Sequence, residues 1–229
     1  MENNIRLNPA STTRTVGAAQ NKVLKNTYLL LALTLIPTVL GAVVGMSVNF
    51  SFFPKSPMIG FVAFLAIAFG FIYAIEKNKD SAWGVAILLG FTFLMGLMLS
   101  RIVGRVLGLS NGGQLIALAA GGTAVIFFGM STLAATIKRD LSGMGKFLFI
   151  GLIVLLVALF ANIILQIPAL TITLMVVAIG IFSAFLMYDI NRIITGGETN
   201  YISATLAIYL SIYNIFANLL ALLGITSSD

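Results

Sequence analysis

The sequence contains no cysteine and no histidine, and charged residues make up only 9% of its 229 residues. Without cysteine the chain can form neither a disulfide nor a thiolate metal site. Without histidine it lacks the commonest metal ligand and the usual general base near neutral pH. These absences exclude a zinc protease with an HExxH motif and a Ser–His catalytic pair.

The scarcity of charge also argues against a soluble domain, which carries roughly 25% charged residues. Instead, 59% of the residues are hydrophobic, and they form continuous apolar runs of the length that a helix needs to cross a bilayer. The chain is therefore predicted to be an all-α polytopic membrane protein with seven transmembrane helices. We place the spans at 27–47, 57–75, 83–102, 114–135, 146–164, 170–188 and 202–223.

The hydropathy pattern divides the chain into two segments. Residues 1–25 are polar and carry four basic side chains, and such a segment cannot bury a core. We expect a flexible basic cytoplasmic tail at 1–25 and a seven-helix transmembrane domain at 26–229.

The distribution of lysine and arginine predicts the orientation. Three basic residues, Lys55, Arg101 and Arg105, lie on the side away from the N-terminus. Basic residues concentrate on the cytoplasmic side of membrane proteins, so we expect a cytoplasmic N-terminus and, after seven spans, a periplasmic C-terminus. A re-entrant seventh helix would return the C-terminus inside. The orientation accounts for the net charge of +6 without nucleic acid as a partner. The ten basic residues on the N-terminal side are Arg6, Arg14, Lys22, Lys25, Lys77, Lys79, Lys138, Arg139, Lys146 and Arg192.

Small residues recur at a spacing of four, as in Gly41 and Gly45 or Gly104 and Gly108. Small residues let helices approach closely in lipid, where association depends on packing. Packing inside the bundle is the main interpretation. A face for dimerisation is the alternative, so the oligomeric state stays open.

Charged residues inside a membrane are costly and are candidates for function. Asp189 ends the sixth span, and Arg192 follows three residues later, so the two can pair on one helical face. One interpretation is a plain ion pair at the interface. The other is a carboxylate that titrates inside the bundle and controls a gate.

The seventh span carries an ordered polar stripe, in which Ser211, Asn214 and Asn218 fall on one face. Lipid offers no partner for these groups, so the stripe must face the bundle or a wet cavity. It is either a set of contacts between helices or the polar lining of a pore or proton path.

An intramembrane aspartyl protease needs two carboxylates that share a proton. Asp189 has no second aspartate in another span and no GxGD motif follows. The chain is therefore not predicted to be an enzyme, and nothing in it calls for a cofactor.

The sequence resembles the Bax inhibitor-1 family of seven-span membrane proteins, most closely its bacterial YccA branch. The resemblance covers nearly everything after the first twenty or so residues. The segments that carry it are NKVLKNTYLLLALTL at 21–35, ALAAGGTAVIFF at 117–128, ANIILQIPAL at 161–170 and IITGGETNYISATLAIYLSIYNIFANLLALLG at 193–224.

The resemblance implies a bundle of six helices around a central seventh. In one branch it also implies a calcium leak channel that is gated by two aspartates, one on helix six and one on helix seven. Asp189 matches the first position, Ser211 occupies the second, and the second span lacks that branch's arginine. A pH-sensitive calcium or proton pathway is accordingly the alternative function, with Asp189 as gate or weak calcium contact and Arg192, Ser211, Asn214 and Asn218 along it.

The other branch is similar to a modulator of FtsH, a membrane-anchored ATP-dependent protease of the bacterial inner membrane. It implies FtsH and its associated membrane complex as partners, and a chain that engages the protease and slows its action on other membrane proteins. A protease needs a flexible segment on which to start pulling. We expect the tail to supply it, through Arg6, Arg14, Lys22 and Lys25.

Overall fold

The computed structural model describes residues 9–48, 57–137 and 139–227. These residues form seven α-helices, each long and apolar enough to cross a membrane, as the hydropathy pattern predicts. No strand occurs in the described ranges, so the all-α fold class is confirmed. The helices are α1 (Pro9–Ser47), α2 (Pro57–Lys77), α3 (Ala82–Leu107), α4 (Gly112–Thr136), α5 (Ser142–Leu165), α6 (Pro168–Thr195) and α7 (Tyr201–Thr226).

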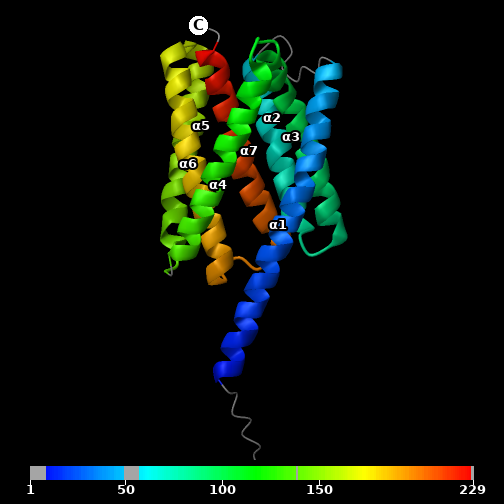
Figure 1. The fold of residues 1–229 in the computed structure, drawn as a ribbon, viewed down its shortest axis with the longest axis vertical. Coiled ribbons are helices and arrows are strands. Elements are labelled where there is room, and N and C mark those ends of the chain that lie inside the picture. The colour runs from blue at the N-terminus through cyan, green and yellow to red at the C-terminus, as the bar shows by residue number, and fades with distance from the viewer. Residues whose placement is uncertain (1–8, 49–56, 138, 228–229) are drawn as a thin grey trace, which may run out of the picture.

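The predicted spans agree with the helices to within five residues, except at two ends where the difference is larger. Helix α1 begins at Pro9, and its N-terminal part projects beyond the ends of the other helices (Figure 1). Helix α6 continues from the predicted end at 188 to Thr195. The prediction of a flexible tail at 1–25 stays a prediction, because residues 1–8 lie outside the described part and 9–25 belong to α1.

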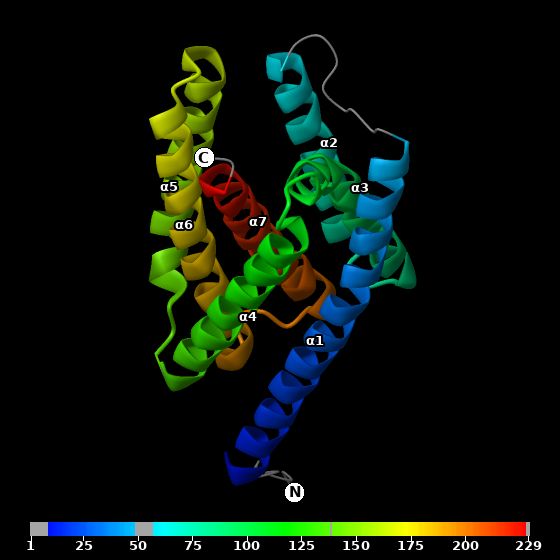
Figure 2. The same cartoon turned by 45° about the horizontal axis from the view of Figure 1, so that its top comes forward.

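The helices form one bundle in which successive helices alternate in direction (Figures 1 and 2). Helix α1 packs most extensively on α3, and α6 packs on α7. Helix α7 also contacts α1, α2, α3 and α4, whereas α5 packs on α6 and touches α2. Since the described contacts of α5 are with α2 and α6 and not with α7, an arrangement of six helices around α7 is not confirmed.

The core lies where α1, α2, α3, α6 and α7 meet. Tyr209 and Phe91 are fully buried there, with ring centroids 6.5 Å apart in an edge-on arrangement. The outward faces of the helices carry large exposed apolar side chains, such as Phe147, which is 78% exposed. Exposed apolar surface on this scale is expected where lipid replaces water.

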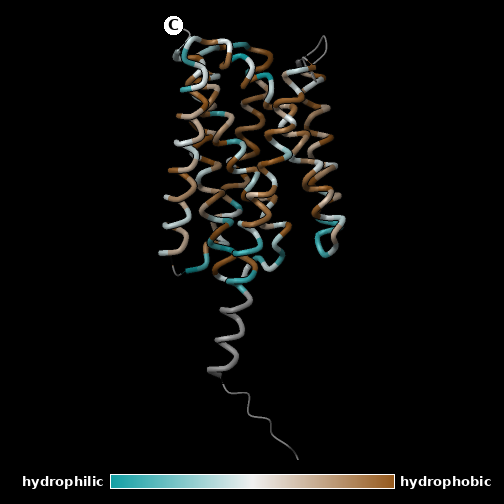
Figure 3. The backbone as a smooth tube through the Cα atoms, turned by 45° about the vertical axis from the view of Figure 1, so that its right-hand side comes forward, coloured by the Kyte–Doolittle hydropathy of each residue, from teal (hydrophilic) through white to brown (hydrophobic). Residues whose placement is uncertain are grey.

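Polar residues concentrate at the helix ends (Figure 3). The turn between α2 and α3 and the loop between α6 and α7 meet at one end of the bundle, because Asn200 donates a hydrogen bond to the carbonyl oxygen of Lys79 over 3.0 Å. Lys22 and Lys25 on α1 are exposed. The assignment of this end to the cytoplasm stays a prediction from the basic residues.

Candidate functional site

Asp189 lies in the last two turns of α6 and is only 9% exposed. The residues that follow it, Ile190 and Asn191, are fully buried. The sequence predicted a carboxylate within the bundle as one of two interpretations, and the burial agrees with that placement. A role as gate or calcium contact stays a prediction.

Arg192 pairs with Glu198 and not, as the spacing of three suggested, with Asp189. Its Nη2 lies 3.4 Å from Glu198 Oε2, and its guanidinium carbon lies 5.7 Å from the centre of the Tyr188 ring. The reason is the end of α6, where Gly196 adopts a left-handed conformation with φ of 81°. The chain turns back there, and the N–H of Glu198 bonds the Arg192 carbonyl oxygen over 3.1 Å.

Ser211 on α7 is 2% exposed, so both residues at the positions of the aspartate pair are buried. They lie on the neighbouring helices α6 and α7. The amide of Asn214 donates to the Leu210 carbonyl oxygen, and that of Asn218 donates to the Asn214 carbonyl oxygen, each over 2.8 Å. These two bonds run within α7 and do not connect helices.

Tyr209 and Tyr213, which form a row beside the polar stripe, make contacts between helices, the role that was one of the two interpretations of the stripe. The Tyr209 hydroxyl shares a 2.9 Å hydrogen bond with Thr38 Oγ1 on α1. The Tyr213 hydroxyl donates to the Met95 carbonyl oxygen on α3 over 3.1 Å. Both hydroxyls therefore tie α7 to its neighbours.

Asn191 is a buried polar residue that the sequence reasoning missed. Its Oδ1 accepts a 3.2 Å hydrogen bond from the N–H of Leu141, and its Nδ2 donates to the Ile137 carbonyl oxygen over 3.1 Å. Longer contacts of 3.4 Å reach the carbonyl oxygens of Ala134 and Arg139. One side chain of α6 thus fixes the connection between α4 and α5.

Asn200 has the same role on the neighbouring connection. Its Oδ1 caps α7 by accepting from the N–H groups of Ile202 and Ser203, at 2.9 and 3.2 Å. Its Nδ2 also donates to Asp80 Oδ1 over 2.8 Å. An asparagine just before an apolar helix is a recognised capping signal, so this residue could have been found.

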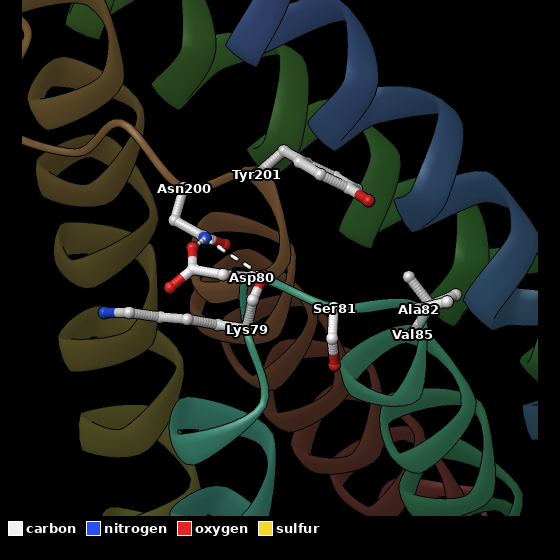
Figure 4. Close-up of a pocket in the computed structure, with 7 residues that line it drawn as sticks. All are labelled: Lys79, Asp80, Ser81, Ala82, Val85, Asn200 and Tyr201. Atoms are coloured by element: carbon white, nitrogen blue, oxygen red, sulfur yellow. Dashed lines mark hydrogen bonds between the residues drawn. The ribbon is translucent and has the colours of Figure 1, made fainter.

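A shallow pocket of about 580 Å³ lies beside Asn200 (Figure 4). Neither Asp189 nor Ser211 lines it. Lys79, one of the lining residues, bonds Glu76 over 3.2 Å, and this hydrogen bond raises the pKa of the lysine. The full lining is Lys79, Asp80, Ser81, Ala82, Val85, Asn200 and Tyr201.

The four basic residues expected to engage a protease lie toward the start of the chain. Lys22 and Lys25 are exposed on α1. Arg6 lies outside the described residues, and Arg14 falls on α1 at a position whose side chain is not described. Within the described residues, no ion pair joins Lys22 or Lys25 to Asp189.

The chain matches known proteins over most of its length. A family model described as "Inhibitor of apoptosis-promoting Bax1" matches residues 20–228. An uncharacterized protein of Neisseria meningitidis serogroup A is 38% identical over 207 residues, which cover 90% of this chain and 91% of that protein. An uncharacterized membrane protein of Vibrio cholerae is 38% identical over 209 residues, or 91% and 92% of the two chains.

A relative from Escherichia coli carries a functional name. The protein of Escherichia coli K12 named "Modulator of FtsH protease YccA" is 37% identical over 224 residues. The matched region covers 98% of this chain and 99% of that relative.

Proposed function

Because the chain belongs to the Bax inhibitor-1 family, we propose that it binds an FtsH-type protease in the bacterial inner membrane and slows the degradation of other membrane proteins. The similarity to the E. coli modulator supports this proposal, since it extends over 98% of the chain. The relative is a regulator by name, and the proposed role here is likewise regulatory and not enzymatic.

The shape of α1 suggests how the chain engages the protease. A membrane-anchored protease has to grip a segment outside the bilayer before it can pull. Helix α1 projects beyond the bundle (Figure 2), on the end where Lys22 and Lys25 are exposed. The segment before Gln20, where the apolar span begins, is the proposed grip.

Deletion of residues 1–19 tests the proposal, because it leaves the span Gln20–Ser47 intact. In cells that contain the protease, we expect slower turnover of the shortened chain and faster turnover of a second membrane substrate. A matched control replaces residues 1–19 with a glycine–serine segment of equal length, which preserves a flexible grip. Unchanged turnover of both proteins after the deletion would remove this mechanism.

A second control tests charge. Replacing Arg6, Arg14, Lys22 and Lys25 with glutamine preserves length but removes the four positive charges. Loss of engagement in this variant, with full engagement by a wild-type tail, would assign the contact to the basic side chains. Normal engagement would show that the projecting segment is sufficient without its charges.

Ion conduction is distinguishable from this role by flux into proteoliposomes. Calcium takes about six to eight oxygen ligands, whereas Asp189 is a single buried carboxylate. Within the described ranges no group of three acidic residues could hold a metal ion. We expect negligible calcium flux, equal for the wild type and Asp189→Asn. Flux that the substitution abolishes would favour the channel.

A further inference from the structure

Most of the buried positions of α1 hold glycine, alanine or threonine. Its outward face carries large exposed ones, such as Leu29 at 61% and Val39 at 61%. The attachment of α1 to the bundle therefore lies on one narrow stripe. The buried positions recur every three or four residues and are Thr27, Leu30, Leu31, Thr34, Thr38, Gly41, Ala42 and Gly45.

The stripe brings the backbone of α1 against the backbone of α3. A Cβ atom added to Gly41 would collide with the carbonyl oxygen of Phe93, and one added to Gly96 would collide with the carbonyl oxygen of Thr38. A Cβ added to Gly45 would lie 2.5 Å from Ser100 Oγ. We call these contacts of Thr38, Gly41 and Gly45 with Phe93, Gly96 and Ser100 the α1–α3 seam.

Two hydrogen bonds extend this attachment to α7. Thr38 Oγ1 and the Tyr209 hydroxyl are 2.9 Å apart, and Thr205 Oγ1 donates to the Thr27 carbonyl oxygen over 3.3 Å. Helices α1 and α3 run in the same direction along the bundle (Figure 1). A pull on the N-terminus along the axis therefore shears the whole seam at once and does not open it one contact at a time.

We propose that the α1–α3 seam is the element that resists extraction of the chain from its N-terminus, and so sets how long the chain occupies the protease. The regulatory part of this proposal rests on the proposed function. The mechanical claim, that the seam resists extraction of α1, does not depend on it.

Sliding explains the resistance. A shift of α1 by one residue moves it about 1.5 Å along α3. Such a shift would break the close contact of Gly41 with the Phe93 carbonyl oxygen and that of Gly96 with the Thr38 carbonyl oxygen at the same time. The contacts of the seam are therefore lost together, and the seam must break as a unit.

Force spectroscopy on the full chain in a lipid bilayer tests this claim without any protease. The N-terminus is pulled from the side on which α1 projects, and the first rupture reports α1. We expect Gly45→Ala and Gly96→Ala to raise the rupture rate at constant force by a factor of about 5–30. If Gly96→Ala does not fold, Gly45→Ala decides the question. Tyr209→Phe removes the hydroxyl that bonds Thr38 Oγ1 and the Thr92 carbonyl oxygen, and it tests the neighbouring attachment to α7.

Two matched controls separate the seam from general destabilisation. Gly121→Ala makes the same chemical change on α4, where a Cβ meets nothing within 4 Å, and we expect wild-type behaviour. Leu155→Ala removes a side chain that is 3% exposed and packs in the cluster between α5 and α6. It should lower overall stability but leave the first rupture unchanged. Unchanged rupture in the seam variants, or an equal effect of Leu155→Ala, would overturn the proposal.

Turnover in cells with the protease then tests the regulatory use. We expect Gly45→Ala to be degraded faster than Gly121→Ala, and to protect a second membrane substrate less. If the seam variants rupture early under force but the protease does not act on the chain at all, the proposed function fails and the mechanical claim stands. If the protease engages the chain but rupture is unchanged, the seam proposal fails alone.

Discussion

Replacing Asn191 with leucine, which keeps the branch at Cγ but removes the polar atoms, should destabilise the protein markedly. The substitution leaves the N–H of Leu141 without its 3.2 Å partner and the carbonyl oxygen of Ile137 without its 3.1 Å partner. A buried backbone group without a partner costs about 1–3 kcal/mol. Leu141 is buried and bears most of this cost, whereas Ile137 is half-buried and water can replace part of its bond. We expect a loss of about 3 kcal/mol.

For a chain of this size, about 3 kcal/mol corresponds to a decrease in Tm of about 6–12 °C. Thermal unfolding in detergent measures the decrease. Hydrogen exchange should also show faster exchange at the start of α5, since the connection at Leu141 loses its anchor.

Asn218→Leu is the matched control. The Asn218 amide donates only to a carbonyl oxygen of its own helix, and the residue is half-buried. Its replacement should cost less than about 1 kcal/mol. Equal Tm shifts in the two variants, or exchange at Leu141 that does not change, would refute the assignment of Asn191 as the anchor.

Two further predictions concern the loops at the same end of the bundle. Asn200→Ala removes the cap of α7 and the bond to the Lys79 carbonyl oxygen, and should cost about 1–2 kcal/mol. Faster hydrogen exchange in the turn between α2 and α3 should accompany the loss, and unchanged exchange there would contradict the link. Asp140 accepts hydrogen bonds from the hydroxyl and the N–H of Ser142, at 2.6 and 2.9 Å, and these bonds hold the pKa of its carboxyl below the usual value. The contribution of Asp140 is present above the unfolded-state pKa of about 3.9 and is lost as pH falls through the lower folded-state value. Asp140→Asn should therefore reduce the fall in Tm below about pH 4. A fall in Tm identical to that of the wild type over this pH range would argue against the contribution of Asp140.

Hydropathy predicted the helices well because span length is a direct consequence of bilayer thickness. The two missed ends are polar stretches of helix, where no apolar run marks the boundary. Helix α6 continues to Thr195 because Ile190 and Ile193 still pack in the core, although Asp189, Asn191 and Arg192 interrupt the apolar run.

The candidate site was predicted less completely. Asp189 could be singled out because a charge in an apolar segment is rare. An ion pair with Arg192 was one of its two interpretations, but the turn at Gly196 brings Glu198 back to the arginine instead. Asn191 could not have been found from spacing, since its partners lie on a connection about 50 residues earlier in the chain.

Helices α1 and α3 approach each other closely because Gly41 and Gly96 have no side-chain atoms between the two backbones. Glycine is already the smallest residue, so no substitution at these two positions can bring the helices nearer together. In a related chain, a single methyl group added at one of these glycines would weaken the attachment of the first helix to the bundle. A stronger attachment of this helix would have to come from other positions, through hydrogen-bonded hydroxyl pairs such as that of Thr38 and Tyr209.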